Sequence, residues 1–252
     1  MPIPSGRGQA PPLHFLRFAP ESLRLDAWHD CCTARLLWDP GIRIHAAEAL
    51  DLLGDAGATI DRERNLARIP RELAERCLAS APSSFELYDS EGRPKVRYAG
   101  DQVQFDPGSA AIEILDHGAT TSRPPVTADF VRFIQLAEGL APIDAVPTSL
   151  VCQDVPQSIG DLYRLYLVLR FAAKPVVTGA FGIDSWHVMR ELLATVAGGA
   201  EALARRPIAV FDVCPSPPLM WSEITCQNLI DCARARIPAE LVSMPLAGAT
   251  GP

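Results

Sequence analysis

Six side chains that follow predicted strands in the second half of the chain are the first candidates for chemistry. They comprise two carboxylates, two aromatic rings, one amide and one hydroxyl group. The face of an aromatic ring attracts a cation, and a nearby carboxylate adds to that attraction. Brought together, such residues could bind a small positively charged molecule. The six candidates are Gln153, Asp154, Phe181, Asp212, Trp221 and Ser243.

Each candidate also has a purely structural interpretation. Phe181 and Trp221 could pack against neighbours or anchor loops, and Asp154 could form an Asx-turn or cap a helix. Asp212 lies inside an apolar strand and therefore needs a buried partner. Cys214 could be a nucleophile, but no activating base lies nearby in the sequence, which favours a buried thiol.

The elements that would position these candidates are four apolar strands that alternate with helices. The strands begin about 30 residues apart, close to the ~31 residues that a ~250-residue (β/α)8 barrel allots to each unit. Continuous apolar strands are typical of parallel sheets covered on both faces. The pattern predicts an α/β fold of the TIM-barrel type, with only the first half, four β/α units, present. An open doubly wound sheet is the alternative. The predicted strands lie within residues 145–152, 174–181, 207–218 and 238–251, and the intervening helices span 161–173, 184–199 and 222–236.

A different pattern precedes these units. Apolar residues at helical spacing predict a helix that ends at Gly57, and Ile69-Pro70 predicts the start of another. A further helix is predicted within residues 21–38, and Thr127 and Asp129 could cap the helix that precedes the first parallel strand. Short alternating runs predict strands at 85–89, 95–100, 102–106 and 111–116.

We therefore expect a flexible, proline-rich arm at residues 1–20, an α+β region at 21–125 and the first half of a barrel at 126–252. The final residues, LVSMPLAGATGP, read as a strand followed by a loop, which favours a fragment or a truncated product. A half barrel would leave a hydrophobic strand edge unpaired. If the chain is not a fragment, this edge predicts a homo-oligomer or pairing with another chain.

Composition excludes several classes of function. The 252 residues are 48% hydrophobic with a net charge of −7, which is typical of a soluble globular protein and argues against nucleic-acid or anionic-membrane binding. No apolar stretch reaches the ~20 residues that span a bilayer, and no signal-peptide core is present, so we expect a cytoplasmic protein.

The cysteines and the missing motifs narrow the chemistry further. Seven cysteines, an odd number without a C-x-x-C pair, favour reduced thiols and argue against a structural zinc site or any other metal site. The chain has no G-x-G-x-x-G, P-loop or G-x-S-x-G motif, so no nucleotide cofactor or serine hydrolase is expected.

Several runs of residues, in order and spacing, resemble the trimethylamine methyltransferase family, the large subunits of corrinoid-dependent methylamine and betaine demethylation systems. The resemblance covers the chain from about residue 30 onwards. The runs are GIRIHAAEALDLLGDAGATID, ARIPRELAERCLASAPSSFELYD, DHGATTSRPPVTADFVRFIQLAEGLAPID, DVP, KPVVTGAF, PSPPL and PLAGATGP.

This resemblance implies a (β/α)8 barrel that transfers a methyl group from a tertiary or quaternary amine, such as trimethylamine or a glycine-betaine-like compound, to Co(I) of a corrinoid. The D-x-H-x-x-G pattern of many corrinoid-binding proteins is absent, so a separate partner protein would carry the corrinoid. Family members continue well beyond the equivalent of Pro252. The resemblance places the chain in methylamine and one-carbon metabolism, including methanogenesis. A non-catalytic half barrel that assembles through its exposed sheet edge is the alternative function.

Overall fold

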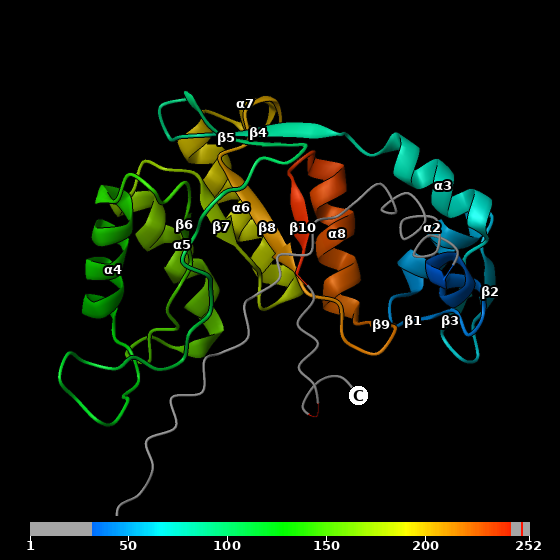
Figure 1. Cartoon of the computed structure of the whole chain (residues 1–252), viewed down its shortest axis with the longest axis horizontal. Helices are drawn as coiled ribbons and strands as arrows, with labels where there is room; N and C mark the ends of the chain where they lie inside the picture. Colours follow the sequence, from blue (N-terminus) through cyan, green and yellow to red (C-terminus); the bar gives the residue numbers. More distant parts are fainter. Residues whose placement is uncertain (1–31, 243–247, 249–252) are drawn as a thin grey trace, which may run out of the picture.

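The structure is a computed structural model that describes residues 32–242 and residue 248. The predicted arm at residues 1–20 lies outside the described residues. Within them, the chain forms a parallel sheet covered by helices, a long hairpin and a second, mixed sheet (Figure 1). No described helix is both long and apolar enough to cross a membrane.

Four short strands form the parallel sheet in chain order, β6-β7-β8-β10. Helices join consecutive strands, so the predicted alternation of apolar strands and helices is confirmed. The strands are β6 (Val146–Pro147), β7 (Val176–Thr178), β8 (Ala209–Val213) and β10 (Ala239–Leu241). The helices are α5 (Gly160–Phe171), α6 (Ile183–Ala197), the short α7 (Ala200–Arg205) and α8 (Glu223–Ala235), and a 3-10 turn, η1 (Gln157–Ile159), precedes α5.

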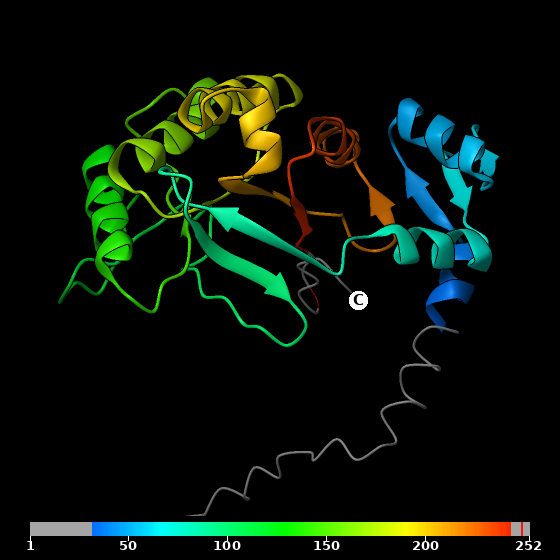
Figure 2. The same cartoon turned by 90° about the horizontal axis from the view of Figure 1, so that it is seen from above.

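Both faces of this sheet are buried, by different partners. Val176 and Phe211 face α5, α6 and α8 and the preceding helix α4 (Thr127–Gly139), in the largest hydrophobic cluster. Val177 and Val210 face the other way and contact Leu87 of the hairpin formed by β4 (Ser84–Tyr88) and β5 (Pro94–Ala99). Figure 2 shows the hairpin on the side of the sheet opposite these helices. Burial on both faces explains why the strands are continuously apolar.

The second sheet has the order β2-β3-β1-β9, with β1 (Ile42–Ile44), β2 (Thr59–Asp61), β3 (Leu66–Arg68) and β9 (Met220–Trp221). Helix α2 (Ala47–Ala56) ends at Gly57, whose backbone at φ +110° donates to the carbonyls of Leu53 and Gly54. This confirms the predicted C-cap, because glycine adopts positive φ at little cost. Helix α3 (Arg71–Ser80) begins after Pro70, also as predicted.

The regions expected at 21–125 and 126–252 each pack or pair with elements of the other. Strand β9 follows β8 in the chain yet pairs with β1 in the second sheet. The hairpin, from the other region, covers the parallel sheet and donates backbone hydrogen bonds from Tyr88 to Pro207 and from Ser90 to Ala173. Neither region therefore buries its own apolar surface alone.

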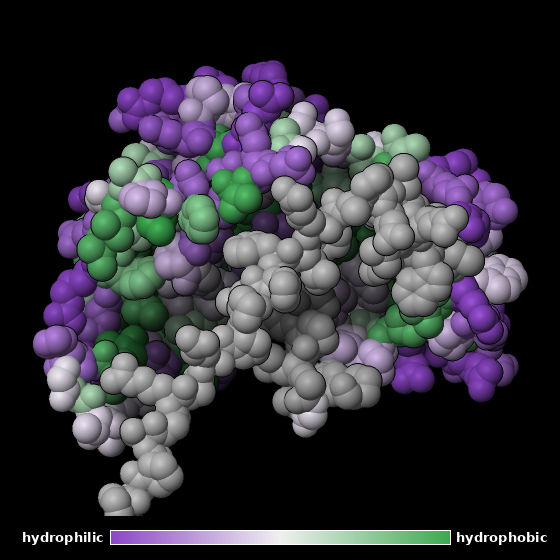
Figure 3. All heavy atoms as spheres, viewed as in Figure 1, coloured by the Kyte–Doolittle hydropathy of each residue, from purple (hydrophilic) through white to green (hydrophobic). Residues whose placement is uncertain are grey.

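Two strand predictions were wrong. Residues 102–106 and 111–116 form no strand, and the latter run makes only isolated bridges, Ala111 to Leu150 and Ile114 to Arg123. Gly108, at φ +76°, interrupts the stretch, so it never runs alongside a partner for long enough to build a ladder. Its large apolar side chains stay exposed, and Figure 3 shows hydrophobic surface on the side of α4 and β6. The exposed residues are Val103, Phe105, Ile112 and Leu115.

A buried carboxylate ties the end of this segment to helix α4. Asp129 accepts hydrogen bonds from both terminal nitrogens of Arg123, at 2.8 and 3.0 Å, and from the Val126 backbone at 3.0 Å. Arg132 donates to the same carboxylate at 2.5 Å. Hydrogen bonding to Arg123 keeps the pKa of Asp129 well below its usual range. Of the two predicted caps, Asp129 is confirmed, whereas Thr127 lies inside the first turn.

Candidate functional site

A cavity of about 530 Å³ lies at the carboxyl ends of β6, β7 and β8. This edge is where parallel α/β sheets bind their ligands. The irregular segment before α4 and the first turns of α8 close the sides of the cavity. Its lining consists of Ser109, Ala110, Thr148, Arg164, Gly179, Ala180, Phe181, Asp212, Val213, Cys214, Ser216, Ser222, Ile224, Thr225, Asn228 and Val242.

The most unusual charge arrangement at the cavity is a pair of carboxyl groups. Asp212, near the end of β8, lies directly opposite Glu240 of β10 in the parallel register. Burial, and then the neighbouring Glu240 carboxyl group with its negative charge, raise the pKa of Asp212 to about 8. Two close carboxyl groups cannot both ionise easily, so Asp212 keeps its proton to a higher pH than an ordinary aspartate does.

The neighbours of Asp212 position it at the cavity wall. The Ser109 hydroxyl donates to Asp212 Oδ2 at 3.1 Å, while Oδ1 is buried and has no hydrogen-bond partner among the described residues. On the adjacent strand, Gly179 leaves room for this side chain, since a Cβ there would lie 3.5 Å from the Asp212 Cβ and 3.2 Å from its carbonyl oxygen. The irregular segment before α4 thus contributes a side-chain contact to the site through Ser109.

A buried arginine provides the opposite charge. Arg164 of α5 donates a hydrogen bond from Nη1 to the Thr148 carbonyl oxygen at 2.6 Å. Its guanidinium carbon lies 4.2 Å from the centre of the Phe181 ring. Burial lowers the pKa of Arg164 to about 10, so the side chain stays protonated at neutral pH. Its Nε has no hydrogen-bond partner in the part of the chain that the structure describes. Asp161 accepts from the Phe181 backbone at 2.8 Å and so fixes the loop after β7.

The sequence-predicted candidates are only partly brought together. Asp212 and Phe181 line the cavity, although one face of the Phe181 ring is already covered by Arg164. Asp154 is exposed and accepts from the Thr127 backbone at 2.9 Å, so it caps α4. Gln153 is exposed and donates to the Val151 carbonyl of its own loop.

The remaining two candidates are Trp221 and Ser243. Trp221 lies in β9, opposite Ile44 of the second sheet, and packs into the core there. Ser243 lies outside the described residues. Cys214, interpreted as a buried thiol, is exposed and lines the cavity.

Sequence reasoning missed three residues of the site. Glu240 stands out as a charge within a predicted apolar strand, and its partner could be found only from the register of β8 and β10. Arg164 is a single cation within the apolar helix sequence DLYRLYLVL, which is a usable signal for a buried charge. Ser109 carries no local signal, because its contact with Asp212 spans about half of the chain.

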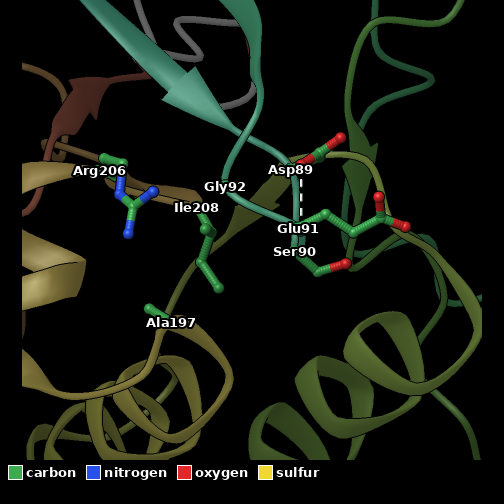
Figure 4. Close-up of a pocket in the computed structure, with 7 residues that line it drawn as sticks. All are labelled: Asp89, Ser90, Glu91, Gly92, Ala197, Arg206 and Ile208. Atoms are coloured by element: carbon green, nitrogen blue, oxygen red, sulfur yellow. Dashed lines mark hydrogen bonds between the residues drawn. The ribbon is translucent and has the colours of Figure 1, made fainter.

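A smaller cavity at the amino ends of the strands has a structural role (Figure 4). Its volume is about 100 Å³, and it lies between the turn of the hairpin and the residues that precede β8. Asp89 is fully buried there and accepts from the backbones of Glu91 and Arg93 and from the Arg93 side chain. Because these bonds satisfy the carboxylate, it stabilises the turn and is not free to bind a ligand. Among the described residues, no group of three or more His, Cys, Asp or Glu side chains could hold a metal ion.

Comparison with known proteins identifies the family. The family described as "Trimethylamine methyltransferase (MTTB)" matches residues 19–252. Trimethylamine methyltransferase MttB of Desulfitobacterium hafniense (strain DSM 10664 / DCB-2) is 27% identical over 218 residues, 86% of this chain and 44% of that protein. MttB of Methanosarcina barkeri is 27% identical over 228 residues, covering 87% and 46% of the two chains.

A relative with a different substrate in its name is equally similar. The glycine betaine methyltransferase of D. hafniense (strain Y51) is 26% identical over 221 residues, again covering 87% of this chain and 46% of the relative. The chain therefore spans about half the length of the curated relatives that it matches. The resemblance noted in the sequence is confirmed: the chain belongs to the trimethylamine methyltransferase family.

Proposed function

We propose that this chain binds a tertiary or quaternary methylated amine and takes part in transferring one of its methyl groups to the corrinoid of a separate protein. The observation that carries the proposal is the Asp212–Glu240 pair beside the cavity at the carboxyl edge of the sheet. The negative charge of these two carboxyl groups matches the positive charge of an ammonium. A quaternary ammonium has no N–H to donate, so charge and apolar contact must provide its affinity.

The volume of the cavity favours a small substrate. At about 530 Å³, it falls within the ~300–1,000 Å³ of sites that hold small molecules. A whole corrinoid macrocycle exceeds it, so the corrinoid would approach from the open side on its own protein. There it would supply Co(I) as the nucleophile. The chain would hold the amine, exclude water from it and orient its methyl group, and a quaternary amine would leave neutral without needing a proton.

Arg164 favours a substrate that carries both charges. Arg164 lines the same cavity as Asp212, and its Nε has no hydrogen-bond partner among the described residues. Guanidinium groups bind carboxylates through directed, charge-assisted hydrogen bonds. A betaine, with a carboxylate at one end and a quaternary ammonium at the other, would satisfy Arg164 and the carboxyl pair at once. Trimethylamine would use the carboxyl pair alone.

The parallel sheet also supports the proposed barrel. Its order, β6-β7-β8-β10, follows the chain without reversal, as in a sector of a (β/α)8 barrel, whereas a doubly wound sheet reverses direction at a switch point. Within the described residues, β10 lies at the edge of the sheet, with Leu241 exposed. This edge supports the alternative of an assembly module, and light scattering of the purified chain tests it, since a stable monomer would exclude pairing through the edge.

Calorimetric titration of the purified chain with glycine betaine, tetramethylammonium and trimethylamine tests the proposed binding. We expect Asp212→Asn and Glu240→Gln to weaken all three, and the exposed Asp101→Asn to leave them unchanged. Arg164→Met should weaken glycine betaine but not tetramethylammonium. Methyl transfer to free cob(I)alamin then tests catalysis. A folded chain that binds none of these amines would refute the proposal.

A further inference from the structure

The outer face of the second sheet carries a cavity of about 420 Å³ that is unrelated to the site at the parallel sheet. Three arginines from different parts of the sheet converge on it. Arg43 comes from β1, Arg64 from the turn between β2 and β3, and Arg68 from the end of β3. Leu66 and Leu219 contribute apolar walls.

The pairing of the strands places these arginines on one face. Side chains alternate along a strand, and Ile42 and Ile44 are buried in the core of this sheet while Arg43 between them is exposed. Arg43 lies opposite Leu66 in the antiparallel register. Arg68, two residues beyond Leu66, therefore shares the face of Arg43, on the side away from the core.

Gly41 makes room for the Arg68 side chain. A Cβ at this position would lie 3.2 Å from the Arg68 Cγ and 2.8 Å from the Ala67 carbonyl oxygen, and the backbone is at φ +85°. Only glycine tolerates both constraints. The stem of Arg68 thus packs over backbone, and its guanidinium reaches the cavity.

These three guanidinium groups have no carboxylate partners among the described residues. Other arginines of this part of the chain are paired, for example Arg62 with Asp51. Neither Arg43, Arg64 nor Arg68 forms an ion pair or a side-chain hydrogen bond within the described chain. Among the described residues, Asp39 is the single acidic side chain in the lining, so this lining has a net charge of about +2 in a chain whose overall charge is −7.

We infer that this cavity is a binding site for a phosphate group, either inorganic phosphate or the phosphate of a small phosphoester. Guanidinium forks match the geometry of phosphate oxygens and form two parallel hydrogen bonds with them. The net charge of the lining matches a phosphate dianion. The volume exceeds that of phosphate alone and leaves space for a small organic group beside the leucine walls.

Calorimetry and ³¹P line broadening with inorganic phosphate, at constant ionic strength in chloride, test this inference on the purified chain. We expect binding of one phosphate per chain, weakened at least about tenfold by Arg43→Gln or Arg68→Gln. Arg62→Gln, in the same turn as Arg64 but outside the lining, is the matched control and should bind as the unaltered chain does. Circular dichroism establishes that each variant is folded.

Two comparisons separate the outcomes. Methyl phosphate that binds more tightly than inorganic phosphate identifies a phosphoester site, whereas tighter inorganic phosphate identifies the free ion; either supports the inference. Acetate that binds as tightly as phosphate would overturn it, because a site for a dianion must discriminate against a monoanion. Phosphate binding unaffected by both variants, or absent from the folded chain, would also overturn it.

Discussion

The raised pKa of Asp212 should make stability depend on pH in an unusual direction. In the folded chain the pKa of Asp212 is raised to about 8, while an unfolded aspartate titrates near its usual value of about 4. Between these values the folded state binds one more proton than the unfolded state. The stabilising contribution is therefore complete below about pH 4 and is lost as the pH rises to about 8.

The expected size of this effect follows from the number of protons involved. One full proton changes the free energy of unfolding by about 1.4 kcal/mol per pH unit. Asp212 borders a cavity that admits water, so we expect about 1 kcal/mol per unit between pH 6 and pH 7.5. Asp212→Asn removes the titrating group. The free energy of unfolding of the variant, relative to that of the unaltered chain, should therefore rise by about 1 kcal/mol for each pH unit.

Urea unfolding followed by circular dichroism, repeated from pH 5.5 to 8.5, measures this difference. Glu240→Gln should reduce the pH dependence without abolishing it, because the Asp212 pKa falls when its negative neighbour is removed but burial still raises it. Asp101→Asn provides the exposed control with the same change in charge. A stability difference between the unaltered chain and Asp212→Asn that stays constant from pH 6 to pH 8 would refute the raised pKa of Asp212.

Three further predictions concern other parts of the chain. Asp129→Asn should lower the free energy of unfolding by about 2 kcal/mol at pH 7, measured in urea, because Arg123 loses a buried carboxylate; this cost should shrink in acid as Asp129 itself becomes protonated. Gly41→Ala should lower it by about 2 kcal/mol, since alanine would be strained at φ +85° and would clash with the Ala67 carbonyl; an unchanged midpoint would contradict the geometry. Arg164→Met should speed amide exchange in the loop after β7, measured by mass spectrometry, and unchanged exchange there would show that the stacking on Phe181 does not order the loop.

The elements that could be predicted are those whose signals are local. Gly57 ends α2 because of its own backbone freedom, and the apolar strands and helices of the parallel sheet follow from their composition and spacing. The second sheet could not be predicted, because β1 and β9 have only three and two residues and pair across most of the chain. Periodicity is not readable in so few residues.

The candidate site was predictable in its position but not in its partners. Asp212 was identified because a carboxylate in an apolar strand needs a partner, and that partner is Glu240 on the neighbouring strand. Trp221 was proposed for the site because it follows β8 closely in the chain. Its strand, β9, instead pairs with β1 in the second sheet. The proximity of a residue to a strand end therefore does not establish that it faces the site.

The pairing of β9 with β1 has a consequence for synthesis on the ribosome. Arg43 and its partner Met220 are separated by most of the described chain, so the edge of β1 stays unpaired until the third parallel strand and the loop after it have emerged. Contacts this distant in sequence form slowly, and unpaired strand edges attract other chains meanwhile. We expect the nascent protein to depend on chaperones during this interval, because its second sheet cannot be completed until β9 has emerged.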